Sequence, residues 1–161
     1  MKDIHIRQIT ADDDAKLALI IRNCLEEFGA VKPNTVYFDE TTDHLYDVFQ
    51  TKRSCYFVVE INGEVSGGAG IFPTEALSAD TCELVKMYLI PEARGQGIAK
   101  SLVKKCMFQA KNNGFSKMYL ESMPELVNAI AMYEKHGFTF IPGPLGNSGH
   151  TGCEVFMVKG L

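Results

Sequence analysis

The chain has 161 residues, 46% of them hydrophobic, and a formal net charge of −4 at pH 7. These values are typical of one ordinary soluble domain, residues 1–161, which can bury a core without disulfides or a structural metal. The five cysteines include no Cys-x-x-Cys pair, which favours a reducing compartment and argues against a zinc site. No apolar run approaches the roughly 20 residues that cross a bilayer, and the start lacks the apolar region of a signal peptide, so we expect a cytoplasmic protein without membrane contact.

Positive charge is concentrated in the middle of the sequence. Residues 84–120 contain seven Lys and Arg and a single acidic residue, whereas the flanking parts are acidic. This distribution indicates a local anion site, although a solvated lysine-rich helix face would give the same counts. Because aromatic residues do not interleave with these lysines, we expect no nucleic-acid partner.

The first elements are a strand and a helix. Alternating isoleucines at the start predict the strand, and Thr10 with Asp13 caps the helix that follows. Apolar residues then recur every three or four positions until Gly29, which ends the helix. Residues 43–49 are compatible with a short helix.

A β-hairpin follows. The run Cys55–Ile61 is rich in β-branched and aromatic residues, and Asn62-Gly63 behind it is a strong turn signal, so the next residues should return antiparallel. Glycines at 67, 68 and 70 weaken this second strand as a packing surface. They indicate either a close backbone approach or a bulged strand, and we favour the bulge.

The second half alternates strands and helices. A strand over 82–90 leads through a glycine-rich stretch into a helix that ends near Gly114, and residues 116–122 form another strand. Pro124 suits the first position of a further helix, which Gly137 ends.

Two last strands, at 138–141 and 153–158, complete the sheet. The order of elements predicts an α/β (α+β) fold with a mixed, mostly antiparallel, twisted sheet of about seven strands and about four flanking helices. One parallel pairing is expected where the helix after Gly97 crosses over.

The stretch Arg94-Gly95-Gln96-Gly97-Ile98-Ala99 lies between a strand and a helix. Unpaired N–H groups and the positive end of the helix dipole meet there and favour phosphate, and Arg94 or Lys100 can add a charge-assisted contact. Two common phosphate loops do not match. A Walker A loop requires Gly-Lys-Ser/Thr where Gly97-Ile98-Ala99 stands, and the dinucleotide fingerprint requires Gly or Ala in place of Lys100.

Two segments together resemble a known family. Arg94-x-x-Gly97-x-Ala99, with a proline before it and an amphipathic helix after it, resembles the acyl-CoA pyrophosphate loop of the GNAT N-acyltransferase superfamily. Residues 133–138, Tyr-Glu-Lys-His-Gly-Phe, resemble that family's Y-E-K-x-G-F segment. The likeness is clear over residues 55–140, about half of the chain.

The resemblance implies transfer of an acyl group, usually acetyl, from coenzyme A to an amine, with acetyl-CoA as co-substrate and no metal. It also implies that the strand before the loop splays from its neighbour and leaves a slot for the pantetheine arm. The strand backbone would bind that arm and polarise the thioester carbonyl, and the loop would hold the pyrophosphate. The cofactor-binding residues expected on this basis are Met87, Tyr88, Leu89, Arg94, Gly95, Gln96, Gly97, Ile98, Ala99 and Lys100.

Two side chains are candidates for the catalytic groups. A lysine-like amine with a pKa near 10.4 is mostly protonated at pH 7, so transfer requires a base. Glu83 occupies the position of the catalytic glutamate in many members of the family, although it could be a structural ion-pair partner. Tyr133 stands where the family keeps an acid for the leaving thiolate, although its ring could merely fill the core. This sequence departs from the family pattern at Leu126, where the family often has Asn. Asn128 lies two positions away from that place, and we assign it no cofactor role.

The loop 142–152 is long, polar and glycine-rich. Asn147 and His150 in it could line an acceptor pocket, but we favour a mobile turn with a solvated histidine. Cys153 is not expected to be a nucleophile, because direct attack by the amine needs none and burial would keep its thiol inert.

Two hypotheses of function follow. The first is an N-acetyltransferase that transfers acetyl to the primary amine of a small molecule or peptide by direct attack in a ternary complex, and the retained Glu83 and Tyr133 favour it. The alternative is a non-catalytic acyl-CoA-binding sensor module of the same fold. The identity of the acceptor is left open, with a weak hint of a cationic acceptor from the acidic first half, and members of the family often form homodimers.

Overall fold

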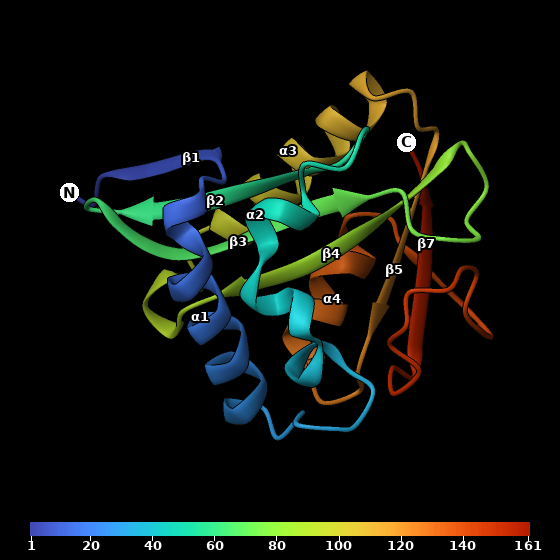
Figure 1. Cartoon of the computed structure of the whole chain (residues 1–161), viewed down its shortest axis with the longest axis horizontal. Helices are drawn as coiled ribbons and strands as arrows, with labels where there is room; N and C mark the ends of the chain where they lie inside the picture. Colours follow the sequence, from blue (N-terminus) through green and yellow to red (C-terminus); the bar gives the residue numbers. More distant parts are fainter.

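One twisted sheet of seven strands organises the computed structural model, which describes residues 1–161 (Figure 1). The strands follow the order β1-β2-β3-β4-β5-β7-β6, and the β4–β5 pair is parallel while the others are antiparallel. This confirms the predicted mixed sheet and its one parallel pairing. The strands are β1 (Ile4–Gln8), β2 (Cys55–Ile61), β3 (Glu64–Phe72), β4 (Thr81–Leu89), β5 (Lys117–Ser122), β6 (Thr139–Ile141) and β7 (Val155–Gly160). The helices are α1 (Asp14–Glu27), α2 (Leu45–Val48), α3 (Ile98–Asn112) and α4 (Val127–Lys135).

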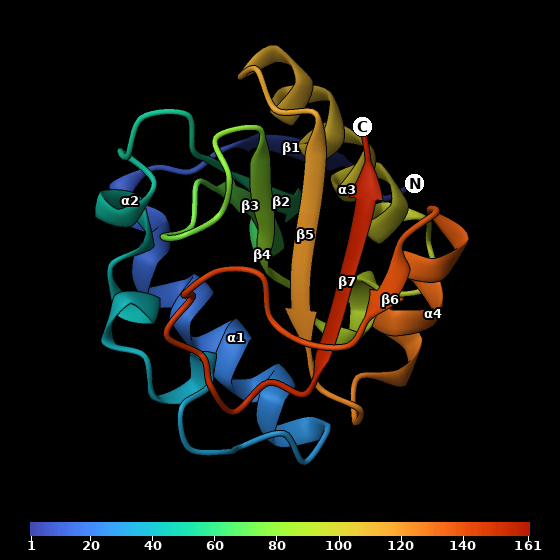
Figure 2. The same cartoon turned by 90° about the vertical axis from the view of Figure 1, so that its right-hand side faces the viewer.

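Helices cover both faces of the sheet (Figure 2). The helices α1 and α2 lie on one face, and α3 and α4 lie on the other. Alternate residues of β2 pack into the cores on the two faces of the sheet, because successive side chains of a strand point to opposite faces. Phe57 and Val59 belong to the core that α3 completes, and Tyr56 and Val58 belong to the core that α1 completes.

The hairpin turn between β2 and β3 has the predicted geometry. Asn62 and Gly63 both have positive φ, 53° and 81°, as a two-residue turn matching the twist of the strands requires. The pairing places Ile61 opposite Glu64 directly beside the turn.

The glycines of β3 make room for an aromatic ring. A Cβ on Gly68 would lie 2.5 Å from a ring carbon of Tyr56, and one on Gly70 would lie 2.7 Å from another. The register of β3 against β2 also shifts, because Val59 pairs with Gly67 and Glu60 with Val65, which leaves Ser66 as an extra residue on β3. The bulge that we favoured is therefore present, but it is an incomplete explanation, because the close approach of the Tyr56 ring independently requires the glycines.

The register of β3 against β4 shifts as well, and this second bulge lies on β4. Gly68 pairs with Tyr88 and Gly70 with Val85, so Lys86 and Met87 together oppose a single residue of β3. Lys86 has a left-handed φ of 50°, and the Tyr56 hydroxyl donates a hydrogen bond of 2.8 Å to its carbonyl oxygen. A bulge of this kind bends the strand and redirects its side chains.

The strands β4 and β5 pair only where they begin. Thr81, Cys82 and Glu83 of β4 pair with the first residues of β5, after which the two strands diverge, as Figure 1 shows. β5 continues along β7 instead. Glu83 is therefore the last paired residue before the sheet opens.

The start of α4 differs from the prediction. Pro124 was expected at the first helical position, but α4 begins at Val127. Pro124 instead lies in a turn closed by the Leu126 N–H, which donates to the Met123 carbonyl at 3.0 Å. Proline suits the second position of such a turn as well as a helix start, so the prediction was wrong by one turn. Gly137 ends α4 with a φ of 91°, as expected.

Candidate functional site

The loop between β4 and α3 presents unpaired backbone donors. Gly95 and Gly97 take left-handed φ values of 71° and 78°, and the N–H groups from Gly95 to Lys100 have no acceptor within the chain. The N–H of Arg94 differs, since it donates to the Pro91 carbonyl at 3.1 Å. Consecutive free donors at the start of a long helix are suited to hold a phosphate group.

The Arg94 side chain holds this loop against α1. Its guanidinium donates to both carboxylate oxygens of Glu27, at 2.9 and 2.8 Å, and its Nε donates to the Leu89 carbonyl at 3.0 Å. The hydrogen bond to Arg94 lowers the pKa of Glu27 below its usual range. Arg94 is therefore engaged within the protein, whereas Lys100 is exposed and makes no ion pair.

A largely apolar slot of about 380 Å³ extends from this loop along the open side of β4. It brings together residues from α1, β4, the β4–α3 loop, α3 and α4. Its lining residues are Cys24 and Phe28 near α1, Met87, Tyr88 and Leu89 of β4, Arg94, Gly95, Gly97 and Ala99 of the loop and α3, and Leu126, Asn128, Ala129 and Met132 at α4. Leu126 and Asn128 both line the slot, although sequence reasoning assigned neither of them a role.

Glu83 lies at a smaller cavity that adjoins the slot. The side chain is buried, with 4% of the residue exposed, and its Oε1 accepts a hydrogen bond of 2.7 Å from the Thr74 hydroxyl. Burial raises the pKa of Glu83 to about 7, repulsion from Glu121 adds to this, and the Thr74 hydrogen bond and nearby Lys86 oppose it. Glu83 takes part in no ion pair, so the alternative of a structural ion-pair partner does not describe it.

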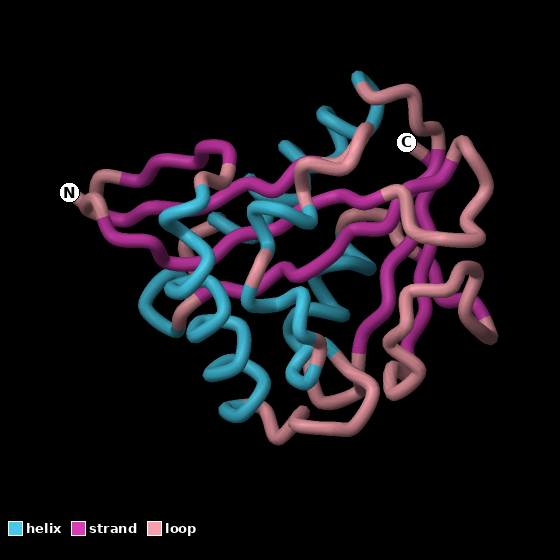
Figure 3. The backbone as a smooth tube through the Cα atoms, in the orientation of Figure 1, coloured by secondary structure: helices cyan, strands magenta, loops and turns pink.

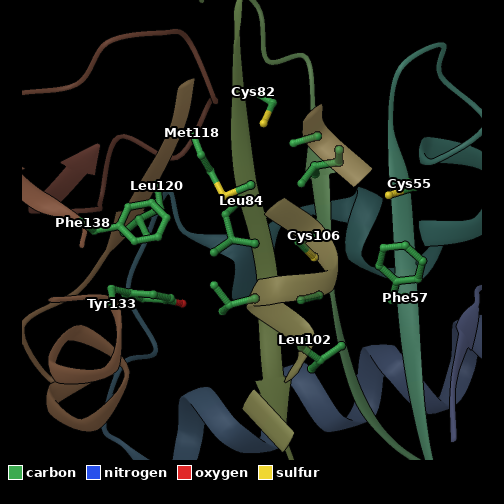
Figure 4. Packing of buried hydrophobic residues seen from close by; sticks show 14 of the residues in the cluster. Cys55, Phe57, Cys82, Leu84, Leu102, Cys106, Met118, Leu120, Tyr133 and Phe138 are labelled. Atoms are coloured by element: carbon green, nitrogen blue, oxygen red, sulfur yellow. The ribbon is translucent and has the colours of Figure 1, made fainter. Parts of the chain in front are cut away.

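Tyr133 lines the same cavity from α4. Its ring is buried and packs edge-on against Phe138, with centroids 5.8 Å apart, and Figure 4 shows its hydroxyl directed toward β4. The hydroxyl makes no hydrogen bond within the chain, and burial raises its pKa well above the ordinary value. The ring is a core residue as the alternative proposed, but the hydroxyl is free to meet a ligand.

The two cavities meet where β4 and α4 face each other, because Met87, Tyr88, Leu126 and Ala129 line both. Apart from Gln96, Ile98 and Lys100, which belong to the loop with the free donors, every predicted site residue lines one of them. At α4, the half-exposed Leu126 and Ala129 line both cavities, whereas Tyr133 is buried.

The loop between β6 and β7, drawn in pink in Figure 3, closes the smaller cavity. His150 is not solvated: its side chain is 14% exposed, and its Nε2 lies 2.7 Å from an Asp39 carboxylate oxygen. The His150 contact holds the pKa of Asp39 well below its usual range. The loop is tied down by the Gly152 N–H, which donates to the Asn34 carbonyl at 2.9 Å. The solvated histidine that we favoured was therefore wrong, and His150 lines the cavity instead.

Cys153 also faces this cavity. Burial raises the pKa of its thiol to about 12, so the thiolate is scarce at neutral pH. Asn147 is exposed and does not line the cavity. No group of three or more His, Cys, Asp and Glu side chains is placed to hold a metal ion. None of the helices combines the length and apolar character that a membrane span requires.

The open sheet, the loop of free donors and the two adjoining cavities together form the candidate site. The family model described as Acetyltransferase (GNAT) family matches residues 21–138. The chain belongs to this family and is an N-acetyltransferase.

Relatives and solved structures agree with this assignment. The Escherichia coli (strain K12) protein named uncharacterized N-acetyltransferase YjgM is 44% identical over 158 residues, which cover 97% of this chain and 94% of that protein. Human N-acetyltransferase 8 is 31% identical over 69% of this chain, which spans about half (52%) of the human protein.

Among solved structures, a GNAT-family acetyltransferase from Staphylococcus aureus Mu50 has a TM-score of 0.86 at 17% identity, covering 99% of each chain. The PaiA N-acetyltransferase from Thermoplasma acidophilum, solved in complex with coenzyme A, has a TM-score of 0.77 at 17% identity, also covering 99% of each chain. At these identities the likeness establishes the fold.

Proposed function

We propose that the protein transfers the acetyl group of acetyl-CoA to the primary amine of a small molecule or peptide, by direct attack in a ternary complex. The observation that carries this proposal is the junction of the two cavities. There a buried carboxyl group, Glu83, and an unpartnered phenol, Tyr133, line one cavity that adjoins the slot from the loop of free donors.

The cofactor fits the free backbone groups of this chain. The N–H groups from Gly95 to Lys100 would hold the pyrophosphate, and the exposed ammonium of Lys100 would add charge. β4 has no partner on its β5 side after Glu83, so the backbone of Met87 and Tyr88 and the N–H of Leu89 would face an extended pantetheine arm. The Leu89 carbonyl is already engaged, because it accepts from Arg94 and Cys24. When bound, the cofactor supplies an activated acetyl thioester. Arg94 would act by holding the loop in place, since Glu27 engages its guanidinium.

Glu83 would act as the base. Deprotonating an amine with a pKa near 10.4 at pH 7 costs about 4.6 kcal/mol. A carboxylate with a pKa of about 7 accepts a proton more readily than an ordinary one, and is still about half ionised at neutral pH. The acceptor amine would enter through the cavity beneath the β6–β7 loop.

Tyr133 would act as the acid. Its raised pKa keeps the hydroxyl protonated at neutral pH, and no group of the chain forms a hydrogen bond with that hydroxyl. The Tyr133 hydroxyl can therefore donate its proton to the departing thiolate of coenzyme A.

Thiol release from acetyl-CoA, measured over a panel of primary amines, tests this function. We expect release only when a suitable amine is present, and a large loss of kcat in Glu83→Gln and Tyr133→Phe. The exposed Glu64→Gln serves as the matched control and should retain full activity. Cofactor binding without turnover for every amine, unchanged in both variants, would support the non-catalytic sensor module instead.

A further inference from the structure

The cavity beneath the β6–β7 loop contains one charged group that has no partner. Lys86 lines this cavity together with two glutamates and His150. Its ammonium makes neither an ion pair nor a hydrogen bond within the chain, although the residue is half-buried. A cation that is partly withdrawn from water is costly unless an anion compensates it.

Each carboxylate at this cavity, by contrast, has donors from the protein. Glu83 accepts from the Thr74 hydroxyl, and Glu121 accepts from the hydroxyls of Tyr119 and Ser148. Asp39, which approaches from the segment between α1 and α2, accepts from His150 and Thr41. The acids therefore have donors within the protein, whereas the Lys86 ammonium has no direct partner, although the carboxylates of Asp39 and Glu83 lie near it.

The backbone directs Lys86 to this position at some cost. The bulge gives Lys86 a left-handed φ of 50°, a conformation that is unfavourable for a non-glycine residue. The Tyr56 hydroxyl holds the bulge by its bond to the Lys86 carbonyl. Burial lowers the pKa of the ammonium, and the nearby carboxylates of Asp39 and Glu83 oppose that shift. The strain and the lack of a partner coincide at one residue, three positions after Glu83.

We propose that Lys86 selects the acceptor: the amine substrates of this enzyme carry a carboxylate on the same molecule, which binds the Lys86 ammonium while the amine faces Glu83. This inference rests on the proposed function and specifies its substrate class as amino carboxylates. It replaces the weak hint of a purely cationic acceptor. Several of the acidic residues behind that hint have other partners, because Asp13 pairs with Arg7 and Asp43 with Arg22.

Matched pairs of acceptors test this selection. Thiol release is measured for α-, β- and γ-amino acids and for their methyl esters, which keep the amine and lose the carboxylate charge. We expect the wild type to favour the acid of at least one pair by about tenfold or more in kcat/KM, as a charge-assisted contact allows. Lys86→Met should abolish this preference mainly by raising KM, and Lys86→Arg should retain part of it.

The variants at position 86 differ in charge but place similar demands on the backbone. Met and Arg are unbranched at Cβ and meet the same backbone conformation as Lys86, and Lys86→Gln is a second uncharged variant should Met impair folding. The exposed Lys52→Met should keep the preference of the wild type. Equal use of acids and esters by the wild type and by both uncharged variants would overturn the inference and leave acetyl transfer standing.

Calorimetry separates this inference from the proposed function. Amino acids and their esters are titrated into the full chain in the presence of coenzyme A, where no turnover is needed. Binding heat from the amino acid but not from its ester would support recognition of the carboxylate by Lys86, provided that the heat is lost in Lys86→Met. This result would stand even if no amine were acetylated. No difference between acid and ester would refute it.

Discussion

Replacing Glu83 by Gln should strongly lower activity and stabilise the protein at the same time. The carboxyl group is buried, and its folded-state pKa of about 7 lies above the ordinary value of 4.5. The folded protein is therefore more stable when the Glu83 carboxyl group is neutral than when it is charged. A glutamine keeps an oxygen that can accept the Thr74 hydrogen bond, but it never ionises.

The sign and size of the effect follow from this raised pKa. Well below pH 4.5 the carboxyl group is protonated in both the folded and unfolded chains, and it then has no effect on the free energy of unfolding. As the pH rises toward 7 the unfolded chain loses its proton first, so the wild type loses stability until the folded carboxyl group also ionises. A shift from 4.5 to about 7 corresponds to about 3 kcal/mol at pH 8, and to under about 1 kcal/mol at pH 5.

Thermal and denaturant unfolding of the wild type and Glu83→Gln at pH 5 and pH 8 measure this difference. We expect the variant to gain several degrees in Tm at pH 8 and little at pH 5. The kcat/KM of the wild type should rise with pH through an inflection near 7 as Glu83 ionises, and the residual activity of the variant should lack that inflection. A variant destabilised equally at both pH values would refute the reasoning, because it would show that the fold does not oppose ionisation of Glu83.

Three further variants probe other parts of the site. Tyr133→Phe should lower kcat by about 100-fold or more with little change in Tm, since the hydroxyl has no partner to lose, and stopped-flow thiol release would measure this. Gly68→Ala should destabilise the fold by about 1–3 kcal/mol in urea, because its Cβ would lie 2.5 Å from the Tyr56 ring; unchanged stability would contradict that contact. Glu27→Gln should weaken coenzyme A binding several-fold in calorimetry by loosening Arg94, and an unchanged Kd would show that the loop needs no support from α1.

The elements of the fold were predictable because their signals are local. Apolar spacing placed α1 and α3, Asn62-Gly63 placed the hairpin turn, and the crossover helix implied the parallel β4–β5 pair. The error at Pro124 is also local in origin. A proline restricts φ equally well in a turn and at a helix start, so the residue alone does not distinguish the two.

Contacts between distant segments could not be predicted in this way. His150 meets Asp39 across 111 residues, and Arg94 meets Glu27 across 67. No spacing or composition links these partners, because the distance between them depends on how loops and helices pack. The buried position of His150, and thus its place at the cavity, had no signal in the sequence.

The sequence by itself determined the order of the elements, the family, and the loop of free donors, because each depends on neighbouring residues. Only the tertiary structure decided which groups are free to act. Glu83, Tyr133 and Lys86 come from a strand and a helix separated by some 50 positions, and their burial and lack of partners arise where β4 leaves β5. Ionisation and hydrogen bonding respond to the surroundings of a side chain, and those surroundings exist only once the sheet has opened and α4 and the β6–β7 loop have packed around the gap.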